Sequence, residues 1–368
     1  MKPAPVSDFP KTAAAVQHGI ERRQHTGVQI YVSVAGQCLL NVGFGMAAVN
    51  QPMTPSTMML WRSAGKPLTS AAILRLCEQG RVRLNTTLAD VISATRGLVI
   101  SDVTIRQILT HTSGLPLIET GWPHCTWDDT LARIYGIRSL IPGSAYQPQA
   151  TWFLLGEILQ RVDSRQRSFS TILAEDLLAL IGIDDVWCGP AANHLKALAD
   201  RLPEFSVTDR GKMVRSDHSA ELWLTQPSPG GNFRGPVREL GRFYEMLLNG
   251  GVNSTGKTVL QSETVAGMTC SQRTGMYDDT MQHVVDLGLG LFLDSNRYGT
   301  NTVPYGFGKY CSSRTFGHGG AQCAMGFCDP AHKLVVTWAA NGFCNEPQHQ
   351  RRNRAINEAV YEDLSLFI

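Results

Sequence analysis

The sequence predicts an α+β fold, with an antiparallel sheet flanked by helices and built from both chain ends, and an inserted, mostly helical domain. Strand-like runs occur before residue 62 and return after residue 288, whereas helical spacing dominates from Leu84 to about Arg201. The 368 residues, 43% of them hydrophobic, are enough for about two domains. We expect residues 1–83 and 225–368 to form the sheet domain and residues 84–224 to form the helical domain.

The first 80 residues are expected to supply a helix, a hairpin and a second helix. The hairpin is predicted by two alternating runs that meet at Ala35-Gly36. The second helix is expected to end before Gly80, a residue that commonly follows the last turn of a helix. The expected elements are a helix over 9–24, strands over 26–34, 37–44 and 58–62, and a helix over 68–79.

The rest of the chain is expected to continue with helices and to return to strands near its end. One helix is preceded by Pro229-Gly230-Gly231 and stopped by Gly250-Gly251. The run Lys333–Asn341 is almost continuously apolar, which is typical of a central strand. Expected helices cover residues 103–110, 152–162, 170–180, 237–249 and 352–363, and expected strands cover 288–294, 314–317, 323–329 and 333–341.

Composition and charge argue against several classes of partner. The net charge of +2 comes from interspersed residues, with no basic patch for nucleic acid and no polybasic anchor for a membrane. No segment reaches the roughly 18 apolar residues of a membrane span, and residues 1–11 lack a signal-peptide pattern. The nine cysteines are odd in number and include no C-x-x-C pair. We therefore expect reduced thiols, a cytoplasmic location, and no metal or organic cofactor.

Ser63 and Lys66 form an S-x-x-K motif at the start of a predicted helix. Three residues apart on a helix, the two side chains lie on one face. A serine hydroxyl is a weak nucleophile until a base takes its proton, and a lysine whose pKa is lowered by desolvation can be that base. Unpaired N–H groups at the helix start would stabilise an oxyanion. The alternative is a capping serine followed by a solvated lysine, and these four residues alone favour that alternative.

Three further stretches accompany the motif. These are residues 103–115, residues 142–156 and the run Phe316–Ala321. In order and spacing, the four stretches resemble those of the serine β-lactamase and penicillin-binding-protein superfamily. Within it they are most similar to the class C β-lactamase-like branch of esterases, D-amino-acid peptidases and transacylases. The resemblance extends from about Val28 to Ala340 and implies an active site in the cleft between the two domains.

The resemblance implies roles for particular residues. Ser63 would be the acylated nucleophile and Lys66 its base or proton shuttle. The stretch His318-Gly319-Gly320 matches the third motif of the family, a strand edge that lines the cleft and pairs with substrate. The backbone N–H groups of Ser63 and Ala321 would form the oxyanion hole.

The middle motif departs from the family pattern. The family places a tyrosine after Pro-Gly as a second proton-transfer group, but here the segment is about one residue short. One alignment puts Gln147 in the tyrosine slot and Gln149 in the asparagine slot that follows, and the other puts Tyr146 in the tyrosine slot. A glutamine can bind substrate but cannot be a general base. Both alignments stay open, with Tyr146 as the catalytic candidate and the two glutamines as substrate-binding candidates.

The predicted function is serine acyl transfer from a small ester or amide. Ser63 would attack the carbonyl, Lys66 would move the proton, and the acyl-enzyme would pass its acyl group to water or to an amine. Transfer to an amine would make the protein a transacylase, as some members of the superfamily are in natural-product biosynthesis. The expected partners are a small-molecule acyl substrate and, for transfer, an amine acceptor; the oligomeric state is not predicted. The alternative is a penicillin-binding-type sensor or a binding protein with impaired chemistry.

Overall fold

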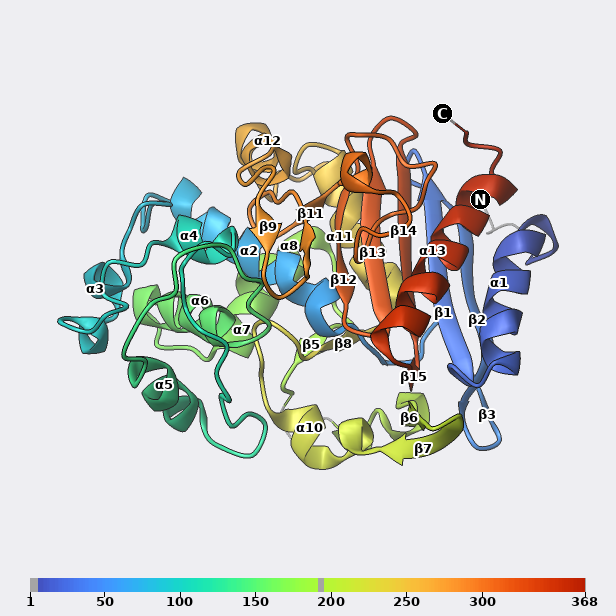
Figure 1. Ribbon diagram of the computed structural model, residues 1–368, viewed down its shortest axis with the longest axis horizontal. Helices are drawn as coiled ribbons and strands as arrows, with labels where there is room; N and C mark the ends of the chain where they lie inside the picture. Colours follow the sequence, from blue (N-terminus) through green and yellow to red (C-terminus); the bar gives the residue numbers. More distant parts are fainter. Residues whose placement is uncertain (1–5, 191–194, 368) are drawn as a thin grey trace.

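The computed structural model describes residues 6–190 and 195–367. Figure 1 shows a sheet-rich half beside a helix-rich half. Seven strands form the main sheet in the order β11-β12-β13-β14-β1-β2-β3, and all neighbouring pairs are antiparallel. The predicted α+β fold built from both chain ends is confirmed. The strands are β1 (Gly27–Val34), β2 (Gln37–Ala48), β3 (Gln51–Pro52), β11 (Phe292–Leu293), β12 (Phe316–Gly320), β13 (Ala324–Asp329) and β14 (Leu334–Ala340).

The central pair of the sheet joins the two ends of the chain. β1 and β14 run antiparallel, with Val28 opposite Ala340 at one end of the register. Every residue of β14 is buried. Alternate side chains of the strand belong to different hydrophobic clusters, Trp338 to one and Ala339 to the other. Both faces of the sheet are therefore covered, which explains why this segment is a continuous apolar run rather than an alternating one.

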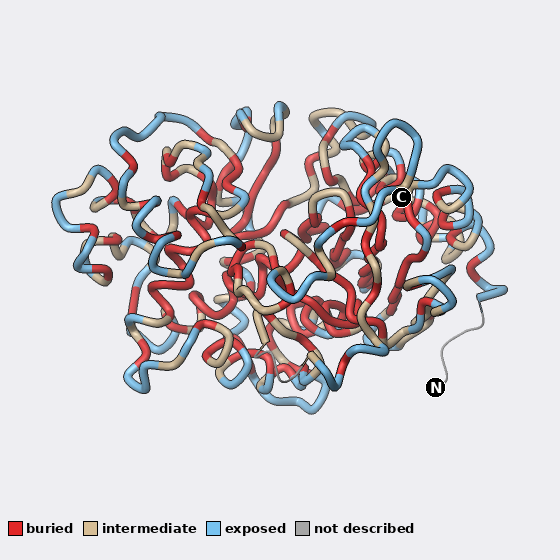
Figure 2. Tube along the Cα trace, turned by 90° about the horizontal axis from the view of Figure 1, so that it is seen from below, coloured by how far each residue is buried: buried red, intermediate tan, exposed pale blue. Residues whose placement is uncertain are grey.

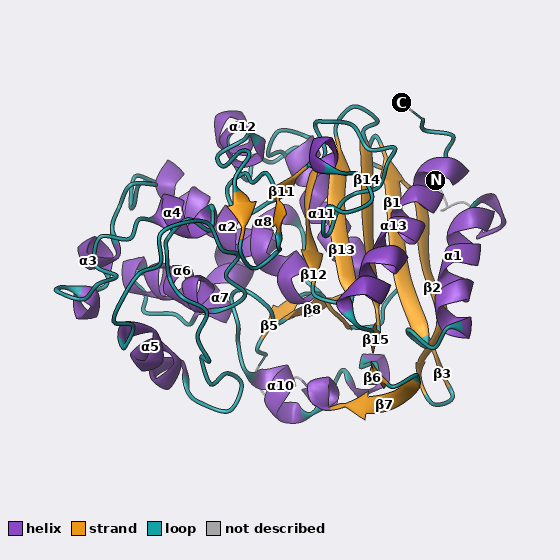
Figure 3. Cartoon of the chain, viewed as in Figure 1, coloured by secondary structure: helices purple, strands orange, loops and turns teal. Residues whose placement is uncertain are grey.

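Helices cover the two faces of the sheet (Figures 1 and 3). The helices α1 (Pro10–Glu21) and α13 (Glu346–Asp363) pack against each other on one face, and α11 (Val237–Leu248) packs against β1 and β14 on the other. α13 begins at Glu346 rather than at the predicted residue 352. The side chain of Asn345 caps it by accepting the N–H of Gln348 at 3.0 Å.

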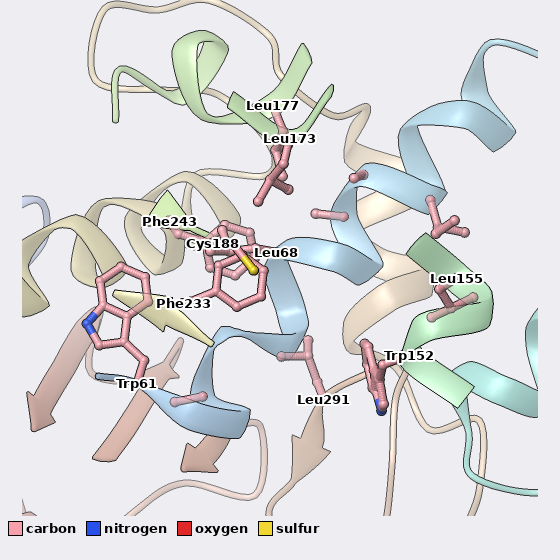
Figure 4. Close-up of a cluster of buried hydrophobic side chains, with 14 of the residues drawn as sticks. Trp61, Leu68, Trp152, Leu155, Leu173, Leu177, Cys188, Phe233, Phe243 and Leu291 are labelled. Carbon is pink, nitrogen blue, oxygen red and sulfur yellow. The ribbon is translucent and has the colours of Figure 1, made fainter. Parts of the chain in front are cut away.

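The helix-rich half packs against the start of α2 (Lys66–Glu78). Figure 4 shows the shared core, in which Leu68 of α2 lies among large side chains such as Trp61, Trp152 and Phe233. Figure 2 shows buried residues gathered toward the middle of the molecule and exposed residues on peripheral loops. The remaining helices are α3 (Leu88–Val91), α4 (Ile105–Leu109), α5 (Trp127–Tyr135), α6 (Ala150–Val162), α7 (Phe169–Leu173), a π-helical turn (Ala174–Leu178), α8 (Ala179–Ile181), α10 (Glu221–Thr225) and α12 (Ser262–Thr269).

The structure contains a hairpin between residues 205 and 216 that the sequence pattern does not predict. It consists of β6 (Phe205–Asp209) and β7 (Lys212–Ser216), and β6 pairs in parallel with β15 (Gly342–Phe343). Segment 205–216 is thereby hydrogen-bonded to the chain just after β14. The domain bounds at residues 84 and 224 stay a prediction. Among residues 6–190 and 195–367, no helix has both the length and the apolar content needed to cross a membrane.

Candidate active site

The S-x-x-K motif lies where a 3₁₀ turn joins a helix. The turn η2 (Arg62–Gly65) runs directly into α2, which starts at Lys66 instead of the predicted Leu68. The Nζ atom of Lys66 is 3.2 Å from the Oγ atom of Ser63. The motif thus brings the two predicted side chains within hydrogen-bonding distance, as a spacing of three residues on one helical face requires.

Lys66 is fully buried, and its surroundings favour a neutral amine. Burial lowers the pKa of its ammonium well below the usual value. Nζ donates to the carbonyl oxygens of Pro148 and Gly230, at 2.7 and 2.5 Å. A neutral amine has two N–H bonds and one lone pair. With both N–H bonds directed to these carbonyls, the lone pair is free to accept the hydroxyl proton of Ser63.

Tyr146 lies beside this pair. Its side chain is buried and lines the same cavity as Ser63, and its ring centroid is 5.4 Å from Nζ of Lys66. Burial raises the pKa of Tyr146, and the neighbouring Ser63 hydroxyl opposes this rise. The phenol is therefore neutral at pH 7 and can donate a proton, whereas the neutral lysine can accept one. The backbone N–H of Tyr146 donates to Asp278 Oδ1 at 3.0 Å and fixes the loop.

Gln147, the other candidate for the tyrosine slot, points away from Ser63. Its side-chain amide donates to the carbonyl oxygen of Leu115, and its backbone N–H donates to His111 Nδ1 at 3.0 Å. The side chain is 2% exposed and lines neither cavity that adjoins Ser63. This geometry gives no support to the predicted contact of Gln147 with substrate. It favours the alignment that places Tyr146 in the slot.

The third motif forms strand β12, next to the nucleophile. His318 and Gly319 line the cavity at Ser63. The Nδ1 atom of His318 donates to the Gly319 carbonyl at 2.8 Å, which leaves Nε2 as an acceptor. Burial, the largest cause, lowers the pKa of His318 to about 3. Gly320 lets the strand approach η2 closely, because a Cβ atom there would lie 2.1 Å from the carbonyl oxygen of Trp61.

Two cavities meet at Ser63, and Pro148 and Ala321 also line both. The larger has a volume of about 440 Å³ and the smaller about 220 Å³. Ala321 lies between them, where its N–H would face an oxyanion, and the Ser63 N–H lies in the first turn of a helix, where N–H groups have no intrahelical acceptor. The oxyanion hole stays a prediction. A cavity of about 840 Å³ near α7 and α8 contacts neither Ser63 nor Lys66.

Most residues that line the two cavities carry no sequence signal. Gln149, which the sequence analysis selected, lines the smaller cavity and accepts a hydrogen bond from Thr120 at 2.8 Å. The others come from segments far apart in the chain, although Arg62 directly precedes the S-x-x-K motif and Gly230 and Gly231 belong to the Pro229-Gly230-Gly231 turn. The larger cavity also includes Thr280, Met281, Phe292, Pro304, Tyr305, Glu346, Pro347 and Gln350, and the smaller includes Leu60, Arg62, Trp122, His218, Trp223, Gly230, Gly231 and Asn232.

A comparison with protein families agrees with this geometry. The family model described as Beta-lactamase matches residues 12–361, a span that contains all of the motifs. The chain belongs to the beta-lactamase family. The predicted membership of the serine β-lactamase-like superfamily is confirmed, and with it the prediction of an enzyme of the serine hydrolase and acyltransferase class.

Individual relatives are distant. Penicillin-binding protein 4 of Amycolatopsis lactamdurans is 25% identical over 248 residues, which are 62% of this chain and 60% of that protein. A solved family VIII carboxylesterase superposes with a TM-score of 0.77 at 20% identity, covering 99% of both chains. EstCE1, described as a hydrolase with promiscuous acyltransferase activity, superposes with a TM-score of 0.79 at 18% identity, covering 97% of this chain and 100% of EstCE1. The two structures show that the fold is shared over the whole chain.

Proposed function

We propose that the protein is a carboxylic-ester hydrolase that also transfers its acyl group to an amine acceptor. The observation that carries the proposal is the position of Ser63 beside the buried side chains of Lys66 and Tyr146, at the meeting point of two cavities. One cavity would hold the acyl group and the other the leaving group or acceptor. The carboxylesterase and acyltransferase chemistry named for the two structural neighbours supports this assignment.

In the acylation step, Oγ of Ser63 forms a bond to the substrate carbonyl carbon while its proton passes to Nζ of Lys66. The oxyanion that develops would accept hydrogen bonds from the N–H groups of Ser63 and Ala321. The bond between the carbonyl carbon and the alcohol oxygen then breaks. Tyr146 gives its hydroxyl proton to that oxygen, and the ammonium of Lys66 replaces this proton, so that protons and charges balance.

In the second step the acyl-enzyme is resolved by water or by an amine. Either nucleophile adds to the same carbonyl carbon, the bond to Ser63 breaks, and the proton of the nucleophile returns Ser63 to its hydroxyl form through the same two groups. Because both outcomes use identical residues, the ratio of hydrolysis to transfer depends on what occupies the cavity that the leaving group has vacated.

The alternative function, a sensor or binding protein with impaired chemistry, is supported by the absence of the family's Tyr-x-Asn pattern. Tyr146 lies at Ser63 and can supply the second proton-transfer group. This removes the sequence feature that supported the alternative and favours a catalytic protein.

A direct experiment combines labelling with product analysis. The enzyme is incubated with a fluorophosphonate probe and, separately, with 4-nitrophenyl butyrate in the presence and absence of benzylamine. We expect the probe to label Ser63, nitrophenol to be released catalytically, and N-benzylbutyramide to form. Ser63→Ala is the control and should lose all three signals. A Ser63→Ala variant with substantial turnover would overturn the proposal.

A further inference from the structure

The two cavities at Ser63 differ in which proton-transfer group they contain. Tyr146 lines the larger cavity and not the smaller one. A general acid that protonates a leaving group must lie on the leaving-group side of the scissile bond. On the proposed function, the leaving group therefore occupies the larger cavity, and the acyl group occupies the smaller cavity of about 220 Å³.

Two tryptophans, a histidine and an arginine are among the residues that line this smaller cavity. The rings of Trp122 and Trp223 meet edge to face with centroids 5.0 Å apart, and the ring of His218 lies 4.3 Å from that of Trp223. Arg62, which directly precedes the nucleophile, supplies the charged group. Its backbone has a φ of +46°, a left-handed conformation that is uncommon for a non-glycine residue and often marks functional sites.

The guanidinium of Arg62 is held in place by neutral groups. It donates to Nε2 of His218 at 2.8 Å and to the carbonyl oxygen of Ala321 at 3.3 Å, and it lies 4.1 Å above the ring of Phe343. His218 donates from Nδ1 to Oγ of Ser216 at 2.6 Å. Burial, with the charges of Arg62 and Arg234, lowers the pKa of His218 to about 3, so the imidazole is neutral. These contacts orient the positive charge without neutralising it.

A second arginine beneath the cavity adds to the same charge. Arg234 is 3% exposed, donates to the His218 carbonyl at 2.7 Å, and has a buried Nη1 atom with no partner among the described residues. The ion pairs formed by residues 6–190 and 195–367 include neither Arg62 nor Arg234. The side chains outside those ranges are not acidic. The buried charge of Arg234 and the half-buried charge of Arg62 therefore have no acidic partner, and an anion bound in the cavity would supply one.

We infer that the acyl group accepted by Ser63 is short and carries a carboxylate, which binds the guanidinium of Arg62 in the smaller cavity. The substrate class is then a monoester of a short dicarboxylic acid. Acylation forms the bond from Oγ of Ser63 to the ester carbonyl and releases the alcohol, while the second carboxylate stays ionised throughout. Arginine suits this role because its planar fork of N–H donors matches a carboxylate.

The test compares two esters that share an alcohol and differ in one end of the acyl chain. Monobenzyl succinate carries a terminal carboxylate, and benzyl pentanoate carries an ethyl group in its place. Release of benzyl alcohol gives kcat/KM for each ester. We expect the wild-type enzyme to prefer the succinate ester. Arg62→Gln should reduce that preference by about 10- to 100-fold, the range expected for losing a charge-assisted hydrogen bond. Arg62→Lys should retain part of it.

The matched control is Arg215→Gln. This variant removes the same charge from the neighbouring strand β7, where the Arg215 side chain is 73% exposed. It should leave the preference unchanged, and fluorophosphonate labelling of each variant checks that Ser63 remains reactive. A wild-type preference for benzyl pentanoate, or an equal loss for both esters in Arg62→Gln, would overturn the inference and leave the proposed function intact. If neither ester reacts and Ser63 is not labelled, both are wrong.

Discussion

Tyr146 and Gln147 are consecutive residues whose side chains point to opposite sides of one loop. Tyr146 lines the cavity at Ser63, whereas the side-chain amide of Gln147 donates to the carbonyl oxygen of Leu115 and lines neither cavity. The backbone N–H groups of both residues are fixed, one by Asp278 and the other by His111. We therefore assign proton transfer to Tyr146 and a structural role to Gln147. Each assignment has a measurable consequence.

The Tyr146→Phe substitution should lower kcat/KM by about 100-fold or more, the effect expected from losing a general acid. Gln147→Ala is the comparison. It leaves the buried Leu115 carbonyl without its donor, so it should lower the free energy of unfolding by about 1–3 kcal/mol. Its turnover per folded molecule should stay near that of the wild type. Steady-state kinetics measure the loss of activity, and denaturant unfolding measures the loss of stability. Equal activity losses in both variants would contradict these two roles.

The pH dependence of kcat/KM should show an acidic limb that belongs to Lys66. The lysine accepts the proton of Ser63 only when it is neutral, and burial places its pKa well below 10.5. Activity should therefore fall as pH drops below the folded-state pKa of Lys66. His318 does not explain a limb near neutrality, because its pKa is about 3. A pH–rate profile with no decrease on the acidic side would show that Lys66 is not the base.

The same lowered pKa predicts how stability changes with pH. Between the folded-state pKa of Lys66 and the unfolded value near 10.5, the unfolded chain binds a proton that the native protein does not. The free energy of unfolding should therefore rise with pH across this window, by up to about 1.4 kcal/mol per unit relative to Lys66→Met. Urea unfolding of both proteins from pH 8 to 10 measures this difference, since contributions from the other groups cancel. A pH-independent difference would mean that Lys66 is charged in the native state.

The Gly320→Ala substitution should impair both folding and catalysis. The added Cβ atom would lie 2.1 Å from the backbone carbonyl oxygen of Trp61 and would push β12 away from the turn that carries Ser63. We expect a lower melting temperature and a large decrease in kcat/KM. Gly267→Ala in α12 is the matched control, because nothing lies within 4 Å of its Cβ position. That helical substitution should be neutral or stabilise by up to about 1 kcal/mol. Normal activity in Gly320→Ala would show that the close strand contact is dispensable.

The main sheet could be predicted because its strands obey simple patterns. β14 is apolar on both faces, and the β1–β2 hairpin turns at Ala35-Gly36, both in the left-handed region with φ of +50° and +76°. The β6–β7 hairpin was missed because its side chains are mostly polar and partly exposed, and because β6 pairs with residues that follow it by more than a hundred positions. The pairing of β6 with β15 leaves no local signal, although the hairpin itself turns at Arg210-Gly211, two residues with positive φ.

In the candidate site, too, local features could be predicted from the sequence, whereas contacts between distant segments could not. Ser63 and Lys66 are three residues apart, so local helical geometry was enough to bring them together. The two alignments of Tyr146 and Gln147 could be separated only by the loop contacts with Asp278 and His111, residues on two other segments of the chain. The walls of the smaller cavity could not be predicted, because the packing of distant loops brings Trp122 and Trp223 to the cavity that Arg62 also lines.

The pairing of β1 with β14 also has a consequence for synthesis. About 300 residues separate the two strands, and a ribosome that adds 5–20 residues per second takes on the order of 15–60 s to produce them. For most of this interval Ser63 and Lys66 have been synthesised, but β12, which provides one wall of the cleft, has not. The apolar edge of β1 is then a site for chaperones or for aggregation. A nascent chain that stops before β12 would contain the nucleophile but not the strand that shapes its cleft. Such a chain would be inactive.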